Sequence, residues 1–105
     1  MVRHVILWKL KEELSAEEKA KVKREAKEHL EGLVGIGPGL REMHIHIEGL
    51  PSSNMDMMLD ALLDDAASLK EYAVNPNHVK VADTYVRPYT VVRSCLDYEV
   101  GQPDS

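Results

Sequence analysis

VRHVILWKL, residues Val2–Leu10, is rich in apolar and β-branched residues. Such residues favour an extended chain, whose side chains alternate between two faces. Ile6 and Trp8 share one face of the predicted strand, while Val5 and Leu7 share the other. Because both faces are apolar, we expect this strand to be covered on both sides of a sheet.

One helix and two further strands are predicted downstream of this strand. Ser15 and Glu18 form a capping box, in which the serine side chain accepts a free helical amide and the glutamate reaches back. The helix that they open runs to about residue 34, with apolar side chains at helical spacing. Alternating apolar and polar residues then predict strands at 40–48 and 55–64, joined as a hairpin.

The C-terminal third contains a helix stop. The helix that opens at Asp65 or Ala66 must end near Asn75, because the residue before Pro76 is driven out of the helical region. We expect Asn77 to cap a second short helix, which runs from position 78 to about position 86. Residues 90–100 then form a last strand.

The order of these elements, β-α-β-β-α(α)-β, predicts an α+β, ferredoxin-like protomer. Its four-stranded antiparallel sheet has helices on one face only. The sequence predicts a single domain over residues 1–100, and residues 101–105 are expected to form a disordered tail.

The helix-free face of that sheet is predicted to be apolar. Val5 and Leu7 lie on it, and Met58, Leu62 and Leu96 extend it. A soluble monomer rarely exposes an apolar area of this size. A second copy of the chain is the simplest cover, so we expect a homodimer packed sheet to sheet, which makes a dimeric α/β barrel.

Composition excludes several classes of partner. The formal net charge of −5 argues against general nucleic-acid binding, which needs a cationic surface. The first apolar run is far too short for a signal-peptide core or a membrane span, so we expect a cytoplasmic protein with no membrane partner. Cys95 is the single cysteine and is interpreted as a small core residue, not a nucleophile. No cofactor is predicted.

Tyr72 and His78 flank the helix stop at Asn75 and Pro76. Histidine titrates near neutral pH and serves as a general base, while a phenol can orient or protonate an oxyanion. The break in the helix can direct His78 towards the cleft that Tyr72 faces, and His4 lies on the strand face that points to the helices. The alternative is a plain helix stop, with a histidine bonded to the backbone and a tyrosine that only packs.

Four segments carry a resemblance to a known family: RHVILWKLKEELS, IGPGL, SLKEYAVNPNHVKV and the terminal LDYEV. Together they resemble the stress-responsive α/β-barrel (Dabb) domain family of the dimeric α/β-barrel superfamily. The resemblance implies a dimer of ferredoxin-like protomers. The family includes a plant enzyme, olivetolic acid cyclase, which closes a linear polyketide by an intramolecular aldol condensation. By position, its residues of interest imply catalytic roles for His78, Tyr72 and His4.

Two departures separate the chain from that cyclase. The first histidine of the cyclase's His-Pro-x-His segment is replaced by Asn75. The aromatic side chains that its first helix sends into the cavity are replaced by Val22, Lys23 and Ala26. The resemblance therefore implies a similar cleft with a different lining.

A separate pattern suggests a metal site. His44 and His46 lie two apart on a predicted strand and so share a face. If the hairpin keeps its apolar faces together, Asp56 and Asp60 come opposite them. Paired imidazoles with carboxylates can hold Zn²⁺ or a similar ion. The alternatives are an edge strand protected by polar side chains, or hydrogen bonds between subunits.

Two functional hypotheses remain open. In the first, a small, largely apolar, carbonyl-containing molecule enters between sheet and helices, and proton abstraction beside the carbonyl is the chemistry. In the second, the protein is a non-catalytic stress-response or structural homodimer. A haem-degrading or quinol-oxidising activity is a third reading, by analogy of fold alone. The lining residues expected for the first hypothesis are Ile6, Trp8, Val22, Ala26 and Leu59.

Overall fold

The computed structural model describes residues 1–101, so the expected disordered tail lies outside the described residues except for Gly101. The helices and strands are those of the predicted order, with a short 3-10 turn (η1) before the last strand. Their bounds are β1 (Val2–Leu10), α1 (Ala16–Glu31), β2 (Leu40–His46), β3 (Met57–Leu63), α2 (Ala66–Val74), α3 (Pro76–Tyr85), η1 (Arg87–Tyr89) and β4 (Thr90–Glu99).

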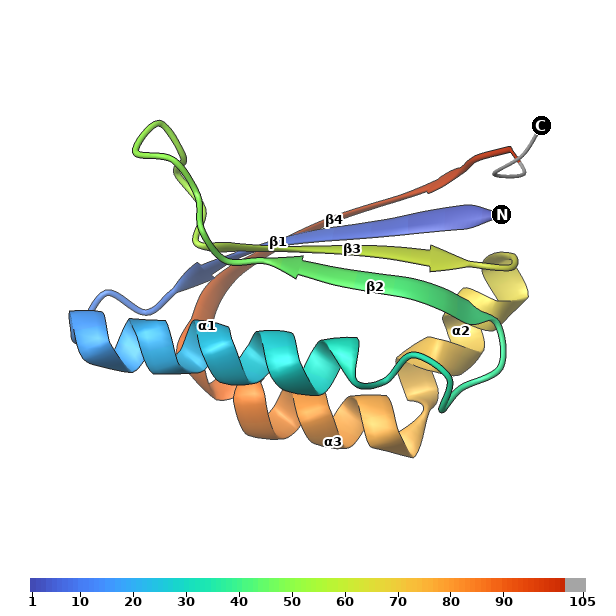
Figure 1. Cartoon of the computed structure of the whole chain (residues 1–105), viewed down its shortest axis with the longest axis horizontal. Coiled ribbons are helices and arrows are strands. Elements are labelled where there is room, and N and C mark those ends of the chain that lie inside the picture. The colour runs from blue at the N-terminus through green and yellow to red at the C-terminus, as the bar shows by residue number, and fades with distance from the viewer. Residues whose placement is uncertain (102–105) are drawn as a thin grey trace.

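The four strands form one antiparallel sheet in the order β2-β3-β1-β4. Figure 1 shows the three α-helices on one face of this sheet, and the loop between β2 and β3 rising from the opposite face. This is the ferredoxin-like arrangement that the sequence predicts. The central strands are β3 and β1, whereas β2 and β4 are the edges.

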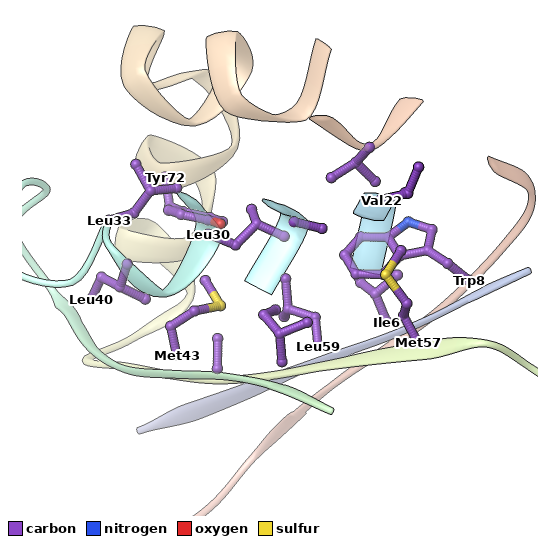
Figure 2. Packing of buried hydrophobic residues seen from close by; sticks show 14 of the residues in the cluster. Ile6, Trp8, Val22, Leu30, Leu33, Leu40, Met43, Met57, Leu59 and Tyr72 are labelled. Atoms are coloured by element: carbon purple, nitrogen blue, oxygen red, sulfur yellow. The ribbon is translucent and has the colours of Figure 1, made fainter. Parts of the chain in front are cut away.

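The hydrophobic core lies between the sheet and the helices (Figure 2). β1 contributes every second side chain to it, as the alternation along its sequence predicts, and Ile6 and Trp8 are both buried. α1 contributes one stripe of buried side chains, Val22, Ala26 and Leu30. The face of β1 that carries His4 is therefore the face that the helices cover.

α1 is fastened to the edge strand β2 by two side chains. The backbone amide of Ile45 donates to Glu31 Oε2 at 2.9 Å, and Lys27 Nζ donates to the carbonyl oxygen of Ile45 at 2.8 Å. Lys27 and Glu31 also form an ion pair with each other at 2.9 Å. The backbone amide and carbonyl of Ile45 lie on an edge strand and would otherwise need water as their partner. Side chains of α1 satisfy both groups.

The helix stop differs from the prediction in its cap. α2 ends at Val74, and its C-cap Asn75 has an extended backbone (φ −62°, ψ 128°) that suits the residue before a proline. α3 begins directly at Pro76, and the Asn75 side chain accepts a hydrogen bond from the Asn77 amide at 2.9 Å. The expectation that Asn77 is the cap was wrong, because Pro76 fits the first helical position, where no amide hydrogen is needed.

The sheet face without helices carries exposed apolar side chains. Leu7 is 36% exposed on β1, and on the same face β4 exposes Leu96, opposite Val5, at 65% and Tyr98, opposite Arg3, at 43%. The predicted apolar face is therefore present, except that Leu62 is already buried within the single chain. Among residues 1–101, no helix has the length and apolar character that crossing a membrane requires.

Candidate functional site

A cavity of about 370 Å³ lies between β1 and β4 on one side and α2 and α3 on the other. Its buried lining, here called the floor, is mainly apolar. Its exposed polar lining, here called the rim, consists of Arg87, Arg93, Cys95 and Asp97. The floor residues are His4, Ile6, Trp8, Leu30, Leu59, Tyr72, Ala82 and Val86.

Tyr72 contributes a polar group to this floor. Its side chain comes from the last turn of α2 and points inwards among core residues (Figure 2). The residue is only 7% exposed, and its hydroxyl oxygen is buried without a hydrogen-bond partner in the described chain. Burial raises the pKa of the Tyr72 hydroxyl, so the group stays protonated and can donate.

His78 lies against Tyr72, with the ring centroids 4.2 Å apart and the rings tilted by 38°. The Nδ1–H of His78 can donate to the carbonyl oxygen of Ala73 at 3.3 Å, which leaves Nε2 as the basic nitrogen. Burial lowers the pKa of His78, and the nearby cations Arg87 and Arg93 lower it further. The imidazole is therefore neutral at physiological pH and able to accept a proton.

His4 completes the group from β1. Its ring lies edge-on to Tyr72 with centroids 6.4 Å apart, and its Nδ1 faces the Asp97 carboxylate of β4 within hydrogen-bonding distance. The antiparallel register pairs His4 with Asp97, so the strands themselves hold this contact. All three predicted catalytic residues thus line one cavity.

Asp97 was missed by the sequence reasoning, and Cys95 was misplaced by it. Cys95 is exposed, not a core residue, because β4 is an edge strand that the helices leave partly uncovered. Its Sγ lies 3.5 Å from Asp97 Oδ1 and 3.8 Å from His4 Nδ1. Slight desolvation and the neighbouring Asp97 carboxylate raise the pKa of this thiol, which leaves it a poor nucleophile. Arg93, Cys95 and Asp97 lie two apart along the strand, and this spacing predicts that their side chains share one face.

The metal site predicted on the hairpin is not assembled in the described chain. His44 does lie opposite Asp60 in the register, but Asp60 pairs with Arg3 at 2.7 Å and His44 contacts Glu42. Asp56 instead accepts the backbone amide of Leu10 at 2.7 Å. His46 lies opposite Met58.

A different group could hold a metal ion. Among residues 1–101, the ligand atoms that gather within 4.8 Å of one another belong to His4, Cys95 and Asp97. This set of nitrogen, sulfur and oxygen is compatible with Zn²⁺. Binding an ion there would require the contact between His4 and Asp97 to open.

The predicted lining residues divide into two groups. Ile6, Trp8 and Leu59 line the cavity. Val22 and Ala26 are buried in the core and are not among its lining residues. They lie on the buried face of α1, so the difference from the cyclase at these two positions changes the core and not the cavity wall.

The sequence model of the stress responsive A/B barrel domain family (Dabb) matches residues 2–100. The chain belongs to this family. This Dabb chain has no match among curated proteins.

Solved structures similar to this Dabb chain share its fold along nearly their whole length. A dimeric protein of unknown function and ferredoxin-like fold from Bacteroides fragilis has 28% sequence identity and a TM-score of 0.88, covering 94% of this chain and 95% of its own. A Dabb family protein from Mesorhizobium loti has 19% identity and a TM-score of 0.73, covering 96% and 97%. Hydroxynitrile lyase from Passiflora edulis has 16% identity and a TM-score of 0.69, covering 96% and 94%.

Proposed function

We propose that this protein binds a small, largely apolar, carbonyl-containing molecule in the cavity between β1, β4, α2 and α3. The observation that carries the proposal is the buried hydroxyl of Tyr72, which has no partner among residues 1–101; Tyr72 lines the cavity. Burying a hydroxyl without a hydrogen bond is costly, and natural proteins rarely accept this cost without a reason. A ligand carbonyl oxygen would supply the missing acceptor.

The neighbouring groups suit acid–base chemistry on such a ligand. Tyr72 would donate to the carbonyl oxygen and polarise it. His78, held neutral by burial, would accept a proton from the adjacent carbon through Nε2. His4, held by Asp97, would be the second imidazole that lines the cavity. The similarity to the hydroxynitrile lyase supports this proposal only in one respect: an enzyme can have this fold.

A thermal-shift screen with small aromatic and aliphatic ketones tests this proposal. Hits should raise the melting temperature of the wild type and lose this effect in Tyr72→Phe and His78→Ala. Tyr85→Phe and His44→Ala are the matched controls, because Tyr85 stacks on His29 outside the cavity and His44 lies exposed on β2. Hits that persist in both cavity variants would contradict the proposal.

We also propose that the chain forms a homodimer through the helix-free face of its sheet. The exposed apolar side chains of β1 and β4 support this assembly, and so does the similar dimeric protein from Bacteroides fragilis. A second copy would remove these side chains from water.

The alternative function is a non-catalytic stress-response or structural homodimer. The apolar sheet face favours it equally, because dimerisation alone would explain that face. It predicts that no ligand raises the melting temperature, and that the Tyr72 and His78 variants respond to the screen as the wild type does.

A further inference from the structure

The rim of the cavity carries two arginines on a protein whose formal net charge is −5. Arg87 precedes β4 in the 3-10 turn, and Arg93 lies within β4 opposite Trp8 in the register. Both are exposed, and both lie close enough to His78 to lower its pKa. The positive charge is therefore local to the cavity and opposite in sign to the molecule as a whole.

Arg93 is the freer of the two cations. Arg87 is already paired with Asp83, one helical turn earlier. Arg93 forms no ion pair in the part of the chain that the structure describes. Its guanidinium group is a planar fork of donors that matches a carboxylate.

Among the described residues, Asp97 is the one acidic side chain of the lining, and it does not balance these cations. Asp97 accepts from His4, and the Cys95 thiol lies 3.5 Å from the same oxygen atom. The other lining groups are apolar, or they are hydrogen-bond donors and neutral bases. A cavity with an apolar floor and unbalanced positive charge at its rim complements a ligand with an apolar body and a negative end.

We infer that the ligand of this cavity is a small apolar acid, whose anionic group is bound at the rim by Arg93 with support from Arg87. The inference rests on the proposed function, since it specifies the ligand class of the same cavity. With the negative end at Arg93, the apolar body lies over Trp8 and Ile6, and its inner end approaches Tyr72 and His78. Because the molecule as a whole carries a formal net charge of −5, the attraction for an anionic group must come from these two local cations.

The test is a calorimetric titration with matched pairs of carboxylates and amides, from benzoate and benzamide to 3-phenylpropanoate and 3-phenylpropanamide. Each amide has the size and carbonyl of its acid but no charge. We expect the acid of the best-fitting pair to bind about tenfold more tightly than its amide, which corresponds to about 1.4 kcal/mol. The preference should weaken as salt is added.

Arg93→Gln should abolish the preference for the acid while leaving the affinity for the amide unchanged. Arg24→Gln is the matched control, because Arg24 is exposed on α1 and does not line the cavity. Equal binding of acid and amide, or a preference that survives Arg93→Gln combined with Arg87→Gln, overturns the inference. If the inference fails but the amides still bind and lose affinity in Tyr72→Phe, the proposed binding of a carbonyl compound is retained. If no compound of either series binds, the inference is overturned, and the ketone screen alone decides the proposed function.

Discussion

Tyr72 buries a hydroxyl group that finds no hydrogen-bond partner in the part of the chain that the structure describes. We predict that Tyr72→Phe raises the free energy of unfolding by about 1 kcal/mol, because it removes an uncompensated polar atom and keeps the ring. Urea denaturation at a fixed protein concentration measures the change. Tyr85→Phe is the control and should not stabilise the protein. A destabilised Tyr72→Phe would mean that the hydroxyl has a partner in the unliganded protein.

His78 gives the protein a pH dependence of known sign. Burial lowers its pKa from 6.5, so the unfolded chain takes up a proton at a pH where the folded chain does not. This favours unfolding, and the stability held at higher pH is lost as the pH falls below about 6.5. We predict that the wild type loses more unfolding free energy than His78→Gln between about pH 7.5 and about pH 5.

Denaturant titrations at several pH values check this prediction, with His46→Gln as the control because His46 is exposed on β2. The stability difference between the wild type and His78→Gln should shrink steadily towards low pH. A difference that stays constant would show that folding does not lower the pKa of His78, and one that grows would show that folding raises it.

Elements near the chain surface were predicted less well than those in the core. β1 was predicted at its observed bounds, because an alternating apolar face needs no knowledge of the rest of the fold. The exposure of Cys95 and the contact of Asp97 with His4 depend on β4 being an edge strand and on its register with β1. Both properties arise from the tertiary fold. Tyr72 and His78 were found through the helix break between them, which is local.

The link between α1 and β2 is a second feature of elements that local patterns do not reveal. Glu31 accepts the Ile45 amide and the Lys27 ammonium at the edge of the sheet. We predict that Glu31→Ala lowers the free energy of unfolding by about 1–2 kcal/mol, because both donors lose their acceptor. Glu28→Ala, on the exposed face of the same helix, should change it by no more than about 0.5 kcal/mol. Equal losses in the two variants, measured by urea denaturation, would contradict this role.

The two faces of the sheet differ in what covers them. One packs against the helices and forms the cavity, while the other exposes Leu7, Leu96 and Tyr98. A single ferredoxin-like layer leaves these apolar side chains in water, and burying each of them contributes a driving force for association. The cavity and the proposed dimer interface therefore lie on opposite faces of the same strands, β1 and β4.

We predict that Leu96→Asp dissociates the proposed homodimer. A carboxylate at this position would be buried without a partner on association, and the apolar contact would be lost as well. Light scattering at micromolar concentration should give twice the chain mass for the wild type and the single-chain mass for the variant. Val74→Asp is the matched control, because Val74 is even more exposed, at 76%, but lies on α2 on the helical side. A wild type with the mass of one chain would disprove the dimer. Dissociation by Val74→Asp would show that the interface lies on the helical side and not on the helix-free face.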